Sequence, residues 1–497
     1  MIPAKGTFIG ILFIFMVSLL TFGCKERHLK LDWETLIKKY EKRKDSLYLE
    51  SVLFLRKNSK DITAEKVIFF DKVTGDIKDI RLDTITSYNS LIDILNRQNI
   101  NFKTETVNNS FIFTTDYIDK YIERSVSLWR QCPWDKNMPD SLFLNYLLPY
   151  KVLWEAPSKN ADFFVQRNKY IIDSFRKINA TSDVIYRRLI SDVEQWFSYT
   201  EGGYTLFSHS PSLDELLCGK RGECVRFATL YTYMLRSAGI PATINLVPIW
   251  GCQNGAHAEV VFMDSTGKMV MSERNRLHRG AKIFRMTFKN QAIWSTQIEP
   301  IIGNNDFALP FLKNDHWLDV TNEHNNVTDI VYDLPKEINV SFAYICVFDY
   351  GNWTPIFWGK VEKGSQVTFK KMGVDMLYHI AIPDSLSGFK LIGKMFLADT
   401  NGNTHNIIPQ QQLYPVMKLS KTNTGRLSWV KKGDRYTLEY YGFDGKWDSL
   451  STQTCNIDSA IVFKTMPSNT VYRLVKQNGE RRLERPFTYE NGKLYWR

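Results

Sequence analysis

The stretch from Gly219 to Phe262 reads GKRGECVRFATLYTYMLRSAGIPATINLVPIWGCQNGAHAEVVF, and it contains the residues best suited to chemistry. Cys224 stands at the start of a predicted helix, and His257 stands at the start of a predicted strand 33 residues later. The unpaired amides and positive dipole end of a helix N-terminus favour a thiolate over a thiol, and Lys220 and Arg221 add to this effect. A buried core cysteine is the alternative interpretation. With a histidine base nearby, however, the pattern predicts a nucleophile.

A helix must position Cys224, and a strand must position His257. Apolar residues after Cys224 recur with helical spacing, and the predicted helix ends in Arg236 followed by Gly239 and Pro241. AEVVFMDSTGKMVMS then reads as two strands around a turn at residues 265–267. Trp250, on the loop that leads to His257, is a candidate to line a substrate cleft, although a tryptophan here is as often part of the packing.

Three acidic residues are candidates to orient the imidazole. Asp264 lies seven residues along the strand from His257, or roughly 23 Å, and is too far away. Folding the hairpin about its turn brings Glu273 within about two positions of His257 on the neighbouring strand, so Glu273 is the choice. Glu259 shares the face of His257 and is the reserve candidate.

The segments GEC, LRSAGIPA and GAHAEVVF resemble the transglutaminase-like core over roughly residues 200–275. That resemblance implies a papain-like triad with Cys224 as nucleophile, His257 as general base and Glu273 as orienting acid. Glu259 stands where the family usually has an aromatic residue, and Glu273 stands where aspartate is commoner. A wider similarity to lipoproteins of the Bacteroides type with a transglutaminase-like domain rests on FLNYLLPYKVLWE, WLDVTNEH, YYGFDGKWDSL and RPFTYENGKLYW.

The rest of the chain predicts an α+β protein of several domains. Helical periodicity dominates from about residue 30 to 200, and hairpin signals dominate after Ile244. We expect a signal peptide at 1–23, a helical N-terminal region at 24–199, a transglutaminase-like core at 200–335, and β-sandwich domains at 336–415 and 416–497.

The N-terminus resembles a bacterial lipoprotein signal. Lys5 precedes an apolar run from Phe8 to Leu20, and Gly23 precedes Cys24. We therefore expect lipid on Cys24 and a protein anchored in the outer membrane at the cell surface, with the periplasmic face as the alternative location and a plain secretory signal as the alternative to lipidation. Six other cysteines remain, and if Cys224 stays reduced at most two disulfides form.

Several partners are not expected. The excess of 64 Lys and Arg over 53 Asp and Glu is scattered, unlike the basic stripe of a nucleic-acid-binding protein. No CxxC, HExxH or EF-hand pattern calls for a metal, and no cofactor is expected.

Two functions fit this sequence. The first is a surface lipoprotein whose thiol acyl-transfer site hydrolyses amide bonds of peptides or glycopeptides. The alternative is a catalytically silent transglutaminase-like scaffold that binds glycan or peptide for nutrient uptake. In that case Trp353, Trp358 and Trp447 are candidate platforms, though each also fits a core position. His209 and Tyr204 precede the helix of Cys224 and are candidate oxyanion donors.

Overall fold

The structure is a computed structural model of the whole chain. It describes residues 31–60, 62–108, 113–132, 138–200, 210–271, 279–304, 308–362, 364–442 and 444–497. The described residues form two compact units. The first takes in the described parts of Met1–Ile244, Glu259–Ser272 and Met286–Asn290, and the second takes in those of Asn245–Ala258, Glu273–Arg285 and Gln291–Arg497.

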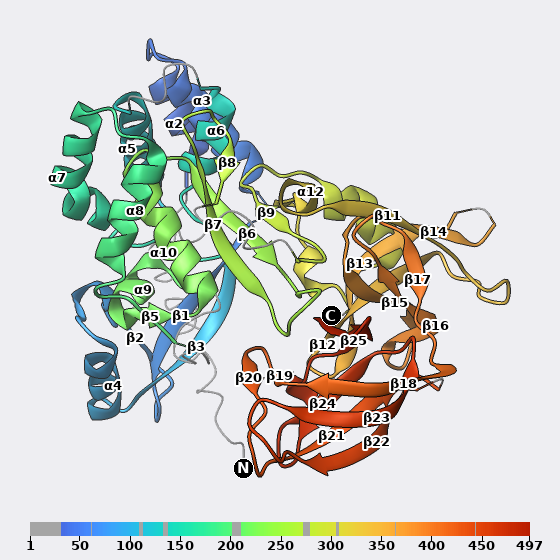
Figure 1. Cartoon of the computed structure of the whole chain (residues 1–497). Coiled ribbons are helices and arrows are strands. Elements are labelled where there is room, and N and C mark those ends of the chain that lie inside the picture. Colours follow the sequence, from blue (N-terminus) through green and yellow to red (C-terminus); the bar gives the residue numbers. More distant parts are fainter. Residues whose placement is uncertain are drawn as a thin grey trace, which may run out of the picture. The chain divides into compact units, whose positions relative to one another are not determined.

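The first unit is mainly helical (Figure 1). Its helices are α2 (Trp33–Tyr40), α3 (Leu47–Asn58), α4 (Tyr88–Arg97), α5 (Thr115–Arg130), α6 (Asp140–Leu142), α7 (Phe163–Lys177), α8 (Ser182–Val193), α9 (Leu213–Gly219) and α10 (Cys224–Ser237). Their apolar faces build two cores, one around Trp129 of α5 and one around Leu230 and Met234 of α10. The predicted N-terminal helices are therefore present.

A three-stranded antiparallel sheet also lies in this N-terminal region, where periodicity predicted mostly helix. Its order is β2 (Ile77–Lys78), β1 (Thr63–Asp71) and β3 (Ile100–Asn108). Strand β1 pairs with β3 over all nine residues but with β2 only at Phe69 and Phe70. Helix α4 covers the sheet with Leu91 and Leu95, which pack on Phe69 in a small separate core. Sheet pairing across an intervening helix leaves no short-range sequence signal.

The strands that follow α10 in the chain include the one that begins at His257. They are β6 (Ala242–Val247), β7 (His257–Met263), β8 (Met269–Val270), β9 (Phe284–Met286) and β10 (Trp317–Asp319). The hairpin of β7 and β8 has Phe262 opposite Val270, with the predicted turn between them. Gly267 in this turn has φ +81°, a conformation that L side chains rarely adopt.

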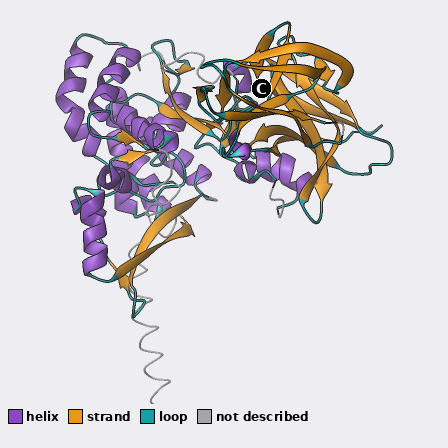
Figure 2. Cartoon of the chain, turned by 60° about the horizontal axis from the view of Figure 1, so that its bottom comes forward, coloured by secondary structure: helices purple, strands orange, loops and turns teal. Residues whose placement is uncertain are grey.

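The second unit is mainly β, as Figure 2 shows by its orange strands. The first sandwich contains β11 (Val327–Asp333) with β14 (Gln366–Gly373), and a five-stranded sheet of β13 (Asn352–Lys360), β12 (Phe342–Asp349), β15 (Met376–Asp384), β16 (Gly388–Ala398) and β17 (Thr404–Asn406). Its core includes Ile345, Phe369 and Tyr378. Two short helices, α11 (Glu299–Ile302) and α12 (Thr321–His324), precede it.

The second sandwich closes the chain. It contains β18 (Gln410–Leu419) with β23 (Ile461–Ser468), β19 (Lys421–Asn423) with β20 (Leu427–Trp429), and a sheet of β22 (Trp447–Thr454), β21 (Arg435–Tyr441), β24 (Tyr472–Lys476), β25 (Phe487–Glu490) and β26 (Lys493–Trp496). Asn491 and Gly492 both have positive φ and join β25 to β26 as a two-residue hairpin, as their sequence predicts. The α+β class with β-rich C-terminal sheets is confirmed.

Within the described ranges, no helix is long and apolar enough to span a membrane.

Candidate functional site

Cys224 is the first residue of α10, as predicted. Helix α9 ends at Gly219, and its C-cap residue Lys220 has a left-handed φ of +52°. The chain then forms the short strand β5 (Arg221–Gly222), which pairs in parallel with β4 (Ser198–Tyr199). This pairing directs the chain into α10, which begins directly after Glu223. The half-buried thiol of Cys224 therefore sits on the first turn of a helix whose remaining turns are buried in the core.

The N-cap residue of α10 provides no side-chain acceptor for the first amides of the helix. Glu223 is the N-cap residue, but its side chain makes no capping hydrogen bond. Its carboxylate lies 3.4 Å from the guanidinium of the buried Arg226 instead. Amides that begin a helix have no partner within it, and they stabilise an anion placed beside them.

Two neighbours of Cys224 have roles that their sequence position did not reveal. A Cβ atom on Gly222 would lie 2.5 Å from Arg226 Cβ, so only glycine fits there. The Arg221 guanidinium lies 5.0 Å from the ring centroid of Tyr88, a cation–π contact with α4. Arg221 is therefore committed to packing, and Lys220 is exposed to solvent.

The other end of α10 is held by Arg236. This buried guanidinium donates through Nε to the carbonyls of Tyr146 and Ala242, and through Nη1 to those of Pro149 and Lys151, at 2.8–3.0 Å. A charged donor that satisfies several buried carbonyls is a strong constraint on position. Helix α10 is thereby fixed against the segment of residues 146–155.

Tyr233, one turn earlier, makes a second link to that segment. Its hydroxyl donates to the buried Glu155 carboxylate at 2.5 Å, and Glu155 also accepts the amides of Val152 and Leu153. Burial, followed by the charge of Glu155, raises the pKa of Tyr233 well above its ordinary value. Burial likewise lowers the pKa of Lys151 to about 7.

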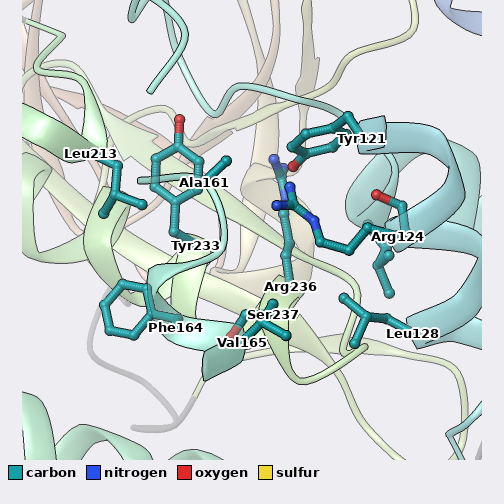
Figure 3. A pocket seen from close by; sticks show the side chains of 12 residues that line it. Tyr121, Arg124, Leu128, Ala161, Phe164, Val165, Leu213, Tyr233, Arg236 and Ser237 are labelled. Carbon is teal, nitrogen blue, oxygen red and sulfur yellow. The ribbon is translucent and has the colours of Figure 1, made fainter. Parts of the chain in front are cut away.

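A small cavity lies beside Arg236 and Tyr233, between α10 and side chains of α5, α7 and α9 (Figure 3). Its volume is about 20 Å³, room for about one water molecule. It is a packing defect and too small for a substrate.

His257 begins β7, and Trp250 lies against it. The two rings stack with centroids 5.6 Å apart and an angle of 26° between their planes. Trp250 is buried and His257 is half-buried, so the indole covers one face of the imidazole. The predicted substrate-lining residue is therefore in direct contact with the predicted base.

The loop between Trp250 and His257 is held by the β-sandwiches. The Gly255 amide donates to Asp349 at 2.7 Å, and Asn254 Nδ2 donates to the Leu483 carbonyl at 2.7 Å. Gly255 has φ +84°, where glycine is favoured. Burial raises the pKa of Asp349 above its ordinary value.

Arg485 holds this loop through hydrogen bonds, and the sequence analysis did not identify this residue. It is fully buried and donates to Asn254 Oδ1 at 3.1 Å, to the Gly251 carbonyl at 3.3 Å, and to the carbonyls of Phe348 and Arg497. Burial lowers its pKa to about 10. The one available signal was the family-like segment RPFTYENGKLYW, which begins with this arginine.

The predicted residues fall into three groups. Cys224 belongs to the first unit, whereas His257 and Trp250 belong to the second. Glu259, the reserve acid, is buried two residues after His257. Glu273 lies outside the described residues, as do Cys24, Tyr204 and His209.

The described cysteines are all free thiols: Cys132, Cys218, Cys224, Cys252, Cys346 and Cys455. Burial raises the pKa of Cys218 to about 11 and raises that of Cys252 as well. Across the part of the chain that the structure describes, no group of three or more His, Cys, Asp or Glu residues is placed to hold a metal ion.

The sequence model of the transglutaminase-like superfamily matches residues 176–269. The chain carries a transglutaminase-like domain. The match runs from the end of α7 through the hairpin of β7 and β8, and it includes both Cys224 and His257. A search of curated proteins gave no match to this chain.

Proposed function

We propose that the transglutaminase-like domain carries out thiol-dependent acyl transfer at Cys224. The observation that carries the proposal is the placement of this cysteine at the first position of α10, inside the segment that matches the superfamily. A helix N-terminus favours the thiolate, which is the nucleophilic form. The helix is held from its far end by Arg236, so the sulfur is attached to a rigid element.

His257 is the proposed general base. Val260 and Phe262 of β7 pack in the same core as Leu230 and Met234 of α10. The strand that begins at His257 is therefore packed on the helix that begins at Cys224. The stacked Trp250 restricts rotation of the imidazole, which preserves a reactive orientation.

Glu273 is the proposed orienting acid. The choice assumed a tight hairpin about residues 265–267, and the described part of that hairpin has Phe262 opposite Val270 and Met263 opposite Met269. An acid that accepts a hydrogen bond from the imidazole holds the tautomer that can take the thiol proton.

The proposed reaction has two steps, which are acylation of Cys224 and hydrolysis of the resulting thioester. His257 takes the proton of the Cys224 thiol, and the sulfur attacks the carbonyl carbon of an amide. The carbon–nitrogen bond breaks, the imidazolium returns the proton to the leaving amine, and a thioester remains on Cys224. Water then attacks the thioester with His257 again as base, which releases the carboxylic acid and the thiol. We propose water as acceptor and peptides or glycopeptides as substrates.

We also propose that the protein is a lipoprotein of the outer membrane, attached through lipid on Cys24. The support is the apolar run that ends in Gly23 and Cys24. Intact-mass analysis of the membrane fraction should find a mature chain that begins at a lipid-modified Cys24. A soluble chain that retains residues before Cys24 would contradict the proposal.

The pH dependence of Cys224 alkylation tests the proposed cysteine–histidine pair. We expect fast labelling with iodoacetamide at pH 6 in the parent protein, measured by mass spectrometry, and slower labelling in His257→Ala. The buried thiol Cys346 is the internal control, since burial raises its pKa well above the ordinary value. Labelling of Cys224 that rises only above pH 8 and ignores His257 would favour the silent scaffold that binds glycan or peptide.

Two of the three candidate tryptophans, Trp353 and Trp447, give little support to that alternative. Trp353 is buried and contacts Phe348, His379 and Tyr441, and Trp447 packs on Phe348 with Arg473 over its ring. Both residues are part of the packing between strands, as the core interpretation predicts.

A further inference from the structure

A pocket of about 810 Å³ lies in the first unit, beside the edge of β1 that faces away from β3. Four consecutive residues of this strand, from Lys66 to Phe69, line it. The segments 77–83 and 156–159 and the start of α9 form its other walls. Its volume is within the range of small-molecule and peptide sites.

Inside this pocket, one residue of β1 has no described backbone partner on the edge that faces away from β3. On the side away from β3, the Glu65 amide donates to the Trp154 carbonyl at 2.6 Å, and Phe69 pairs with Lys78. Amides and carbonyls in an antiparallel strand alternate between its two edges, so those of Val67 point to the same side as those of Glu65 and Phe69. Among the described residues, no backbone group pairs with Val67 on that side.

The gap at Val67 has the size of a short piece of strand. Three residues lie between Glu65 and Phe69, and the four steps from one to the other correspond to about 13 Å in an extended chain. A peptide residue placed in this gap would exchange two hydrogen bonds with Val67, one from its amide and one to its carbonyl.

The rest of the pocket combines apolar surface with charged side chains, among them Lys66, Asp79 and Lys159. Val67, Ile80 and Leu82 line it and also pack against the small core under the sheet, and Ala156 and Pro157 face them from the next segment. This surface suits an aliphatic side chain.

The buried carboxylates of the pocket are already committed. Asp214 accepts from Ser158 Oγ at 2.6 Å and from Asn160 Nδ2 at 2.8 Å, and Glu215 accepts from the Ser212 amide at 2.6 Å in a capping box. Among the described groups that line the pocket, the backbone of Val67 is therefore one that has no backbone partner on this side.

We propose that this pocket binds a short peptide in extended conformation, paired with Val67 and with an aliphatic side chain against Ile80 and Leu82. Such strand addition is a common mode of peptide recognition, in which main-chain bonds supply affinity and pockets for alternate side chains supply specificity. The site does not include Cys224, and the proposal goes beyond the acyl transfer and does not rest on it.

Hydrogen exchange of the parent protein tests the proposal. The probe is the capped tripeptide Ac-Ser-Val-Ser-NH2, which has about the length of the gap, and its fully N-methylated form is the control because it cannot donate main-chain hydrogen bonds. At ten times its dissociation constant, the probe should slow exchange of the Val67 amide about tenfold. The N-methylated peptide should leave that exchange unchanged. Equal protection by both peptides, or by neither, would overturn the proposal.

Two substitutions locate the binding. Ala156→Trp places a large side chain in the pocket and should abolish the protection of Val67, whereas Val184→Trp places the same side chain on an exposed face of α8 and should not. Cys224→Ala should bind the tripeptide as the parent does, so loss of thiol chemistry and loss of this site give different results. Protection of Val67 by chitotriose but not by the tripeptide would replace a peptide ligand with a glycan and overturn the assignment.

Discussion

Two buried arginines hold the two halves of the proposed catalytic pair. Arg236 donates to four carbonyls in the first unit and fixes the helix that begins at Cys224. Arg485 donates to three carbonyls and an amide oxygen in the second unit and fixes the loop that leads to His257. Arg236 lies inside the matched segment 176–269, and Arg485 lies more than 200 residues beyond it.

This difference shows that the matched segment includes the proposed reacting groups but not all the residues that place them. Helix α10 and its support are complete within the first unit. The loop before His257 instead depends on the two β-sandwiches, which the superfamily match does not cover. We therefore expect damage to the sandwiches to affect the base more than the nucleophile.

The largest effect is expected at the acid on the His257 side. Glu273→Gln should retain the fold but lower turnover by up to about 10⁴-fold, because the imidazole loses the partner that fixes its tautomer. The measurement is single-turnover hydrolysis of a peptide amide. Glu259→Gln is the matched control, and a larger loss in that variant would transfer the role to Glu259.

Removal of Arg236 tests the support of the Cys224 half. Arg236→Ala leaves four buried carbonyls without their donor and should lower the free energy of unfolding by about 4 kcal/mol. Urea unfolding measures the change. Arg187→Ala removes an exposed arginine of α8 that pairs with Asp183 and should change stability by less than about 0.5 kcal/mol. Similar losses in both variants would contradict the structural role of Arg236.

Removal of Arg485 tests the support of the His257 half. Arg485→Met should lower turnover by about 10–100-fold, because displacement of a catalytic group by about 1 Å has effects of this size. Alkylation of Cys224 at pH 9, where the thiolate forms without a base, should stay at the parent rate. Arg482→Ala, an exposed arginine three residues earlier, is the control. Equal loss of turnover and of alkylation at pH 9 would mean that Arg485 supports the whole protein.

Opposite pH dependences of stability are expected in the two units. Lys151 has its pKa lowered to about 7 by burial, so between about pH 7 and 10 the unfolded chain binds more protons and stability rises with pH. Glu484 has its pKa raised to about 7 by burial, so between about pH 4.5 and 7 the folded chain binds more protons and stability falls with pH.

Two substitutions separate these slopes. Lys151→Met should flatten the rise above pH 7, and Glu484→Gln should flatten the fall below it, both measured as the free energy of unfolding against pH. Retention of the parent slope in either variant would show that another group titrates in that window.

The helix of Cys224 was predictable because its signals are short-range. Its apolar stripe and its end at Gly239 and Pro241 act over a few residues, and Gly239 has the expected positive φ of +79°. The turn at residues 265–267 and the hairpin at Asn491 and Gly492 were predictable for the same reason.

The N-terminal sheet and the role of Arg485 were not predictable in this way. Strand β1 pairs with β3 across α4, and each strand alone mixes exposed and buried positions without clear alternation. Arg485 stands in a run of charged residues, ERRLER, which reads as surface, yet it is fully buried. Its burial depends on carbonyls of Gly251 and Phe348, which no spacing near residue 485 can indicate.

The amino-acid sequence by itself determined where the proposed nucleophile and base stand in their elements, the strand turns and the α+β class. Periodicity, caps and turn residues act through neighbours a few positions apart, so they can be read along the chain. Only the tertiary structure decided what supports those elements, such as Arg236 on carbonyls 85–90 residues away and Arg485 on Asn254 231 residues away. Hydrogen bonds between distant segments depend on how the whole chain packs, because burial is what makes a charged donor and an unpaired carbonyl require each other.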